Sequence, residues 1–173
     1  MQGFSPNFSW ITHDLAVGGA FPRGAAAILA KDHGVGAVVD VRLEDCDDPD
    51  ELAACGLSFL HLPTVDLCGV SQPMLDAGVR FARTVAAEGR HLLVHCQHGI
   101  GRSATVALCV MVDRGYEPLD ALSVAKDARA LVSPSQAQYE AWTAWMRRRA
   151  PQAAIPSYHE FGCIAYRRLA QQA

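Results

Sequence analysis

A cysteine and an arginine stand near the middle of the chain, separated by five residues that include two glycines. The segment reads His95-Cys96-Gln97-His98-Gly99-Ile100-Gly101-Arg102-Ser103. Apolar residues precede it at 92–94 and follow it at 104–112, which predicts a strand, a tight loop and a helix. Such a loop directs backbone N–H groups inward and lies at a helix N-terminus, where the helix dipole favours an anion. The segment therefore predicts an oxyanion pocket with a thiol at its base.

The side chains in and beside this loop suit attack on a phosphoryl group. Thiols beside converging N–H groups ionise with pKa values of roughly 3.5 to 7.5, so Cys96 is expected to be a nucleophilic thiolate. The guanidinium of Arg102 can bind two phosphoryl oxygens at once. Ser103 could donate a hydrogen bond to the sulfur and stabilise it as a leaving group. His95 could brace the loop from outside.

The backbone between the cysteine and the arginine is expected to bind the phosphate. The phosphate-binding loop would comprise Gln97, His98, Gly99, Ile100, Gly101 and Arg102. Gly99 and Gly101 lack a Cβ, so they can adopt positive φ and let the backbone close around a small anion.

The pattern His-Cys-x-x-Gly-x-Gly-Arg-Ser resembles the signature of the cysteine-dependent protein tyrosine phosphatase superfamily. The chain length and the region before the loop resemble its small dual-specificity branch, over about residues 10 to 146. The resemblance implies a phosphoric monoester hydrolase that works through a cysteinyl-phosphate and needs no metal or other cofactor. Superfamily members that act on inositol lipids often carry lysines in the loop. Here Gln97, His98 and Ile100 are not fixed cations, which disfavours a multiply phosphorylated inositide.

A second residue matches the expected general acid. A departing oxygen needs a proton, and a positioned acid contributes about 10²- to 10⁴-fold to the rate. Asp66 is the only carboxylate in the loop that follows a strand predicted at 57–63, and the resemblance places the acid in such a loop. It would protonate the leaving group and then deprotonate the attacking water; a loop-capping role is the alternative. Cys68 in the same loop could protect Cys96 from oxidation through a disulfide.

The remaining pattern predicts an α/β fold. Strands are expected at 15–17, 36–42, 57–63 and near 92–94, and helices at 23–33, 51–54, 74–88, 102–113, 118–130, from 133 to about 149, and 158–169. Strands alternate with helices first, and helices then dominate. This order predicts a central, mixed, mostly parallel sheet of four to five strands flanked by helices, with the phosphate-binding loop at the carboxyl end of a central strand. We expect one phosphatase domain over 1–173, with a C-terminal helical extension at 151–173.

Several polar groups have two possible interpretations. The acidic run at 43–50 is expected to be a solvated loop, or otherwise a surface that selects basic substrates. Asp40 and Arg42 are expected to form a structural ion pair, or otherwise to line the site. The arginines at 147–149 and 167–168 are expected to complement helix dipoles, with weak affinity for anionic lipid as the alternative. Gln136 and Gln138 lie near the place where tyrosine phosphatases outside the small branch carry a water-orienting glutamine, and neither is assigned that role.

Composition limits the partners. The 173 residues are 50% hydrophobic and 19% charged with a net charge of −3, which gives no reason to expect nucleic acid. No apolar run is long enough to predict a membrane span, and the N-terminus lacks a signal pattern. The six cysteines are unevenly spaced, which fits a reducing compartment. We therefore expect a cytoplasmic protein; the sequence carries no signal of its oligomeric state.

The expected substrate is a phosphorylated protein, at tyrosine, serine or threonine, or a small phosphomonoester. The stretch at 10–19 faintly resembles the mitochondrial phosphatidylglycerophosphate-phosphatase-like group, so a lipid phosphatase acting on phosphatidylglycerophosphate or a phosphoinositide is the alternative. A non-catalytic phosphate-binding module is disfavoured because nucleophile, arginine and acid are all present. A sulfur transferase or an arsenate reductase is disfavoured by Arg102-Ser103 and the distant Asp66.

Overall fold

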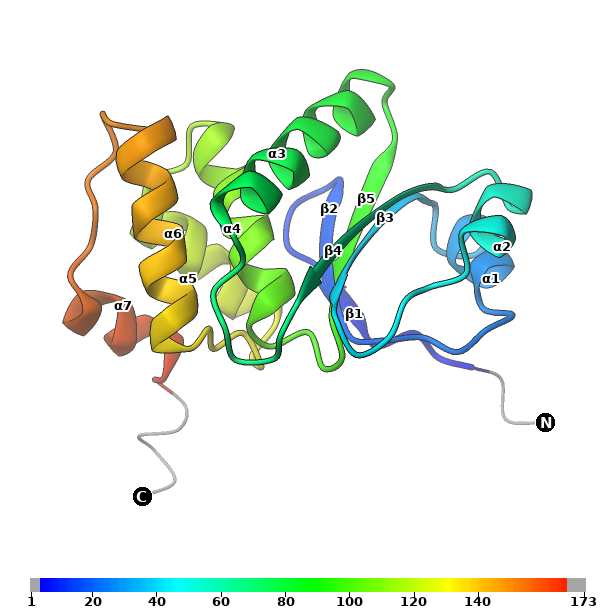
Figure 1. Ribbon diagram of the computed structural model, residues 1–173, viewed down its shortest axis with the longest axis horizontal. Helices are drawn as coiled ribbons and strands as arrows, with labels where there is room; N and C mark the ends of the chain where they lie inside the picture. Colours follow the sequence, from blue (N-terminus) through cyan, green and yellow to red (C-terminus); the bar gives the residue numbers. More distant parts are fainter. Residues whose placement is uncertain (1–3, 168–173) are drawn as a thin grey trace.

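The computed structural model describes residues 4–167 and contains one five-stranded sheet between two layers of helices (Figure 1). The strands are β1 Phe8–Trp10, β2 Leu15–Gly18, β3 Val35–Arg42, β4 Ser58–Thr64 and β5 His91–His95. Their order is β1-β2-β5-β3-β4; β1 is antiparallel to β2, and the other pairs are parallel. The predicted mixed, mostly parallel sheet is confirmed.

Helices cover both faces of the sheet (Figure 1). On one face lie α1 Ala26–Lys31 and α2 Pro49–Ala54. On the other lie α3 Gln72–Ala87, α4 Arg102–Asp113, α5 Pro118–Ala128, α6 Gln136–Arg149 and α7 Tyr158–Ala165. The alternation of side chains along β3 explains why both faces need cover: Val38 packs with the α1 and α2 side, whereas Val39 and Val41 pack with the large core on the other side.

Helix α4 runs through the centre of the larger core. Every residue from Arg102 to Val112 is buried, as the apolar sequence of this segment predicts. Trp142 and Trp145 on α6 also face this core, and both are almost fully buried. Among the described residues, no helix has the length and apolar character needed to cross a bilayer.

Three expectations about the elements need correction. Strand β1 was not predicted, because three half-buried residues are too few to show an alternating pattern. Helix α1 is shorter than the expected 23–33, since Gly24 has a φ of +87° and the helix ends at Lys31. Helix α7 ends at Ala165, and residues 168–169 of the expected final helix lie outside the described residues.

The sheet brings the predicted site together at one edge. Strands β3, β4 and β5 are parallel neighbours, so the loops that follow them emerge at the same, carboxyl edge. These loops contain the acidic run at 43–48, Asp66 and the phosphate-binding loop at 96–101, respectively.

Candidate active site

The sulfur of Cys96 lies at the base of the loop that joins β5 to α4. The residue is 3% exposed, and its Sγ is 3.3 Å from Oγ of Ser103 in the first turn of α4. Backbone N–H groups of Gly99, Ile100 and Ser103 also form hydrogen bonds to the sulfur. The predicted convergence of donors on a thiol is therefore present in the structure.

This environment favours the ionised form of Cys96. Burial by itself raises the pKa of the thiol, because it removes water from a charged sulfur. The hydrogen bonds from Ser103 and from the loop N–H groups outweigh that effect, so the pKa of Cys96 lies below the ordinary value for a thiol. The site thus favours the nucleophilic thiolate form of Cys96 over the thiol.

The two loop glycines are needed for different reasons. Gly99 has a φ of +67°, as expected, and a Cβ at this position would lie 2.4 Å from the carbonyl carbon of Gly18 on β2. Gly101 does not have the expected positive φ; its φ is −123°. A Cβ there would instead lie 2.2 Å from Oε1 of Gln138, so a side chain at this position would require the buried Gln138 side chain to shift.

Arg102 is almost completely buried, and a residue that the sequence did not single out fixes its guanidinium. Nη1 and Nη2 each donate to one carboxylate oxygen of Glu44 at 2.7 Å, and Nη1 also donates to the carbonyl oxygen of Thr64 at 2.8 Å. This contact lowers the pKa of Glu44 from 4.5 to about 2. Among the described residues, Nε of Arg102 has no hydrogen-bond partner. That N–H can bind an oxyanion in the loop.

Asp66 lies at the mouth of the same cavity. One of its carboxylate oxygens is 3.3 Å from Nε of Arg102, and its side chain is 63% exposed. A cavity of about 230 Å³ is lined by Asp66, Leu67, Cys96, His98, Ile100, Gly101, Ser133 and Gln138. The structure therefore brings the expected acid and the expected nucleophile to one cavity. Gln97 is exposed and does not line it.

A buried polar network supports the loop from behind. Nε2 of His95 donates to Asp47 at 2.6 Å, and Nδ1 lies 3.3 Å from the carbonyl oxygen of Cys96. Arg42 donates to both Asp40 and Asp47 at 2.9 Å. These residues do not line the cavity beside Cys96, so the Asp40–Arg42 pair is a structural contact, and His95 contacts the start of the loop through the carbonyl oxygen of Cys96.

The expectation of a solvated loop at 43–50 is confirmed for most of its residues, since 43–46, 49 and 50 are exposed, but it is wrong for Asp47. Glu44 binds Arg102, and Asp47 is buried against Arg42 and His95. The side chain of Asp48 accepts hydrogen bonds from the first N–H groups of α2 and caps that helix. Several of these charges nevertheless have partners, which are buried cations or a helix N-terminus.

The segment that joins α5 to α6 holds the phosphate-binding loop from the opposite side. Arg129 is 5% exposed and donates to the carbonyl oxygens of Gly99 at 2.8 Å and His98 at 2.9 Å. The N–H of Ser133 donates to the carbonyl oxygen of Ile100 at 2.9 Å. These contacts turn the carbonyl groups outward, which leaves the N–H groups facing the cavity. No local pattern indicated Arg129, because its partners in the phosphate-binding loop lie 30 and 31 residues earlier in the chain.

The two glutamines that were left unassigned are now distinguished. Gln138 is 1% exposed and lines the catalytic cavity, and its Oε1 accepts from the N–H of Ser135 at 2.8 Å. Gln136 is exposed and donates to Glu140 at 3.1 Å.

Helix α7 supports this segment in turn. Oγ of Ser133 donates to the carbonyl oxygen of Ala165 at 3.1 Å, and Oη of Tyr166 donates to that of Pro134 at 2.6 Å. Phe161 of α7 is fully buried in the larger core. The C-terminal helix is therefore packed against the segment that forms one wall of the cavity.

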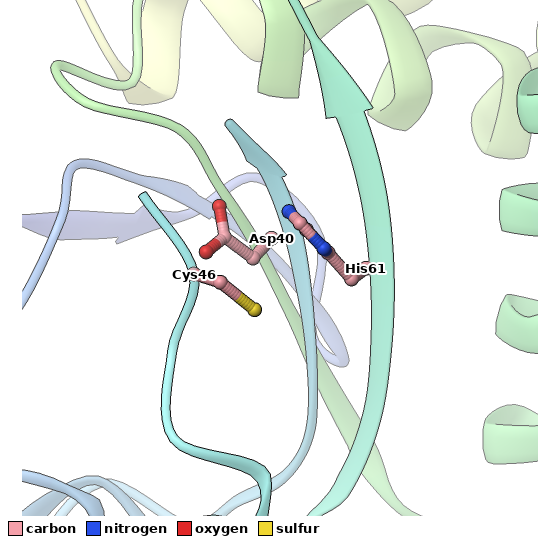
Figure 2. A group of neighbouring side chains, drawn as sticks. All are labelled: Asp40, Cys46 and His61. Carbon is pink, nitrogen blue, oxygen red and sulfur yellow. The ribbon is translucent and has the colours of Figure 1, made fainter. Parts of the chain in front are cut away.

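Two groups of side chains outside the cavity bring possible metal ligands together: Asp40, Cys46 and His61, which come from β3, the loop after it and β4 (Figure 2), and Asp40, Asp47 and His95. Asp40 already accepts from Arg42, and Nε2 of His61 lies 2.7 Å from the carbonyl oxygen of Arg42. Burial and the carboxylates of Asp40 and Asp47 raise the pKa of Cys46, which disfavours a thiolate ligand. We assign no metal to either group, and catalysis without a metal stays a prediction.

The six cysteines are all free. Cys109 is fully buried in α4, as expected for a core residue. Cys68 is exposed and is not among the residues that line the catalytic cavity, so its role in protecting Cys96 stays a prediction.

Comparison with known proteins agrees with this geometry. A family model described as "Dual specificity phosphatase, catalytic domain" matches residues 20–148. Dual specificity protein phosphatase 16 of Homo sapiens is 34% identical over 109 residues, which cover 62% of this chain but only 16% of that protein. The chain thus spans less than a fifth of the length of this relative.

In two further comparisons, the matched region covers a larger share of the related protein. Phosphatidylglycerophosphatase and protein-tyrosine phosphatase 1 of Mus musculus is 28% identical over 137 residues, covering 75% of this chain and 71% of that protein. The crystal structure of PTPMT1 in complex with PI(5)P superposes with a TM-score of 0.77 at 25% identity, over 85% of this chain and 99% of that one.

Proposed function

Because the chain belongs to the dual specificity phosphatase catalytic-domain family, within the cysteine-dependent protein tyrosine phosphatase superfamily, we propose that it hydrolyses phosphoric monoesters through a cysteinyl-phosphate on Cys96. The observation that carries the proposal is the environment of that sulfur. A hydroxyl and three backbone N–H groups converge on Sγ and lower the pKa of the thiol despite its burial. A buried guanidinium belongs to the same site: among the described residues, Nε of Arg102 forms no hydrogen bond, and it lies 3.3 Å from a carboxylate oxygen of Asp66.

In the first step, the thiolate of Cys96 attacks phosphorus, the bond from phosphorus to the ester oxygen breaks, and Asp66 gives its proton to the departing oxygen. The loop N–H groups and Nε of Arg102 bind the equatorial oxygens, where negative charge is concentrated. In the second step, Asp66 takes a proton from water as the water attacks phosphorus. The sulfur–phosphorus bond breaks, inorganic phosphate leaves, and Ser103 donates a hydrogen bond to the released thiolate.

The substrate in this proposal is a phosphorylated protein or a lipid phosphomonoester. Relatives whose names specify protein phosphatases support the first, and a relative named as both a phosphatidylglycerophosphatase and a protein-tyrosine phosphatase supports either. We also propose that α7 belongs to the same domain, since Phe161 completes the core. A reducing compartment such as the cytoplasm would keep Cys96 active, and the free cysteines support that location.

The test compares rates on an aryl phosphate, arsenate and thiosulfate. We expect turnover of the aryl phosphate, with no turnover after Cys96→Ser. Asp66→Asn should lower kcat by about 10²- to 10⁴-fold and keep the first-turnover burst only if the substrate has a good leaving group. Wild-type turnover by Cys96→Ser would refute the mechanism. Tight phosphopeptide binding with no turnover would indicate a non-catalytic phosphate-binding module, and faster turnover of arsenate or thiosulfate would indicate another reaction.

A further inference from the structure

Exposed apolar side chains gather around the mouth of the catalytic cavity. Among the described residues, seven large hydrophobic side chains are exposed. Five of them lie on the loops that build the site; we call these five the apolar rim: Leu43, Val65, Leu67, Ile100 and Leu131. Their exposed fractions range from 37% to 69%. An apolar group concentrated at a functional opening marks a contact surface rather than scattered surface residues.

Two rim residues, Leu67 and Ile100, line the cavity together with Cys96. Val65 directly precedes the expected acid, Asp66. Whatever carries a phosphate to the sulfur must therefore cover these side chains.

The other two rim residues continue the surface onto neighbouring loops. The N–H of Leu43 donates to the carbonyl oxygen of Thr64 at 3.2 Å, and that same carbonyl accepts from Arg102. Leu131 lies between Arg129 and Ser133, which both contact the phosphate-binding loop. The rim thus includes side chains from four separate loops.

The backbone holds Leu67 in an unusual conformation. Its φ is +62°, and it is the one non-glycine residue with positive φ in the described part of the chain. Oγ of Ser135 donates to its carbonyl oxygen at 2.7 Å and fixes this geometry. Residues held in this region cost free energy and cluster at functional sites, and here the result is a leucine that is 69% exposed at the cavity mouth.

The chemistry of the rim fits hydrocarbon better than a peptide. Binding energy at protein interfaces is concentrated in tryptophan, tyrosine and arginine, with leucine and valine under-represented. Among the described residues that line the cavity there is no tryptophan, tyrosine or lysine, and the guanidinium of Arg102 is buried and bound by Glu44. Aliphatic side chains instead gain free energy by leaving water for an apolar phase.

The charges near the rim also limit the partner. The exposed charged side chains beside the cavity are acidic, Glu44 and Asp66. The arginines of α6 lie at the other end of that helix, where Arg148 and Arg149 donate to Asp76 of α3 (Figure 1). The mouth therefore suits one phosphate among uncharged or zwitterionic neighbours and disfavours a strongly anionic surface.

We propose that the apolar rim docks on a lipid surface, and that the substrate is a lipid with a single phosphomonoester presented at that surface. The proposal rests on the phosphatase function proposed above and narrows its substrate class. The phosphate enters the cavity toward Cys96, while the rim contacts the glycerol and first acyl carbons that surround it.

A binding test needs no turnover. The Cys96→Ser protein is sedimented with phosphatidylcholine vesicles that contain a small fraction of phosphatidic acid, which carries one phosphomonoester. We expect binding, and about 10- to 100-fold weaker binding after adding Leu43→Ser and Leu131→Ser, since two half-inserted leucines lose about the transfer free energy of one buried leucine. Tyr116→Ser is the matched control. It removes a large side chain that is 37% exposed, beyond the far end of α4 and about 18 Å along the helix.

A kinetic test distinguishes lipid from peptide. With wild-type protein and a short-chain phosphatidic acid, we expect the rate to rise at least tenfold as the substrate passes its critical micelle concentration. The ratio of kcat/KM for the micellar lipid to kcat/KM for an aryl phosphate should fall about 10- to 100-fold in the Leu43→Ser/Leu131→Ser variant and stay constant in Tyr116→Ser.

Three results would overturn the proposal: no vesicle binding by the Cys96→Ser protein, an unchanged ratio in the rim variant, or a higher kcat/KM for a phosphopeptide that falls when the rim is changed. If the wild type hydrolysed no phosphomonoester at all, that result would refute the proposed phosphatase function alone. The vesicle experiment would still decide whether the apolar rim binds lipid.

Discussion

Replacing Glu44 with glutamine tests how the catalytic arginine is held. The carboxylate of Glu44 binds both terminal nitrogens of Arg102 at 2.7 Å. Glutamine has nearly the same shape, but it carries no charge and offers only one acceptor oxygen. In Glu44→Gln, the guanidinium would keep its bond to the carbonyl of Thr64 and lose the fork that fixes its plane.

The size of the effect follows from the pKa of Glu44. Lowering that pKa from 4.5 to about 2 corresponds to an upper limit of roughly 3.4 kcal/mol. The Glu44 side chain is 44% exposed, so solvent screening reduces the interaction to about 1–2 kcal/mol. If this free energy is needed to orient Arg102 in the transition state, kcat/KM on an aryl phosphate falls about 5- to 30-fold. Affinity for vanadate should fall by a similar factor.

The pH dependence has a definite sign. The pKa of Glu44 is lower in the folded than in the unfolded protein, so its contribution to the free energy of unfolding is fully present above about pH 4.5. It is lost as the pH falls from 4.5 toward 2. The difference in unfolding free energy between wild type and Glu44→Gln should therefore be constant at pH 5–8 and shrink in acid, as urea titrations at several pH values can measure.

A neighbouring carboxylate provides the matched control. Asp45 is also exposed in the acidic loop, but it pairs with Arg42 at 3.2 Å and not with Arg102. Asp45→Asn should leave kcat/KM within about twofold of wild type. The reasoning is refuted if Glu44→Gln keeps the wild-type kcat/KM and vanadate affinity, or if both variants lower them equally.

Three further predictions address the loop and its supports. Alkylation of Cys96 by iodoacetamide should show an inflection below the value of about 8.5 for a free thiol, because the loop donors lower its pKa; an inflection at or above that value would contradict the site. Gly99→Ala should lower the free energy of unfolding in urea by about 3 kcal/mol or more, because the added Cβ would overlap the backbone of β2. Gly89 has a similar φ and open space around it, so Gly89→Ala is the control and should cost only about 1–2 kcal/mol. Equal losses in the two variants would show that the overlap at Gly99 is relieved. Ser135→Ala should lower the free energy of unfolding by about 1 kcal/mol, because α6 loses its N-cap. It should also lower kcat, because the carbonyl group of Leu67 loses its hydrogen bond. An unchanged kcat would show that Ser135 matters only as a helix cap.

The catalytic loop was predictable because its information is local. Nucleophile, glycines and arginine lie within seven residues, and the apolar segments on both sides have strong helix and strand patterns. Asp66 required a resemblance as well, since the loop that brings it to the cavity is recognisable only as a loop. The parallel order of β3, β4 and β5 then explains why these separate loops meet.

The missed residues depend on contacts that are distant in sequence. Glu44 is one of several acidic residues in a short run, and nothing local distinguishes the one that binds an arginine 58 residues later. Arg129 looks like an ordinary residue at a helix end, yet it binds carbonyl groups about 30 residues earlier. Strand β1 is recognisable only by its pairing with β2. Tertiary partners, and not local propensity, decide all three.

Helix α7 has a practical consequence for anyone who shortens this protein. The match to the family model ends at residue 148, whereas Phe161 and Tyr166 contact the core and the wall of the cavity. Truncation at residue 148 would remove the ring of Phe161, which packs against Trp142. It would also remove Tyr166, which donates a hydrogen bond to the carbonyl oxygen of Pro134. The aromatic contacts of α7 therefore belong to the folded unit although they lie beyond the family match, and an expression clone should include the whole of this helix.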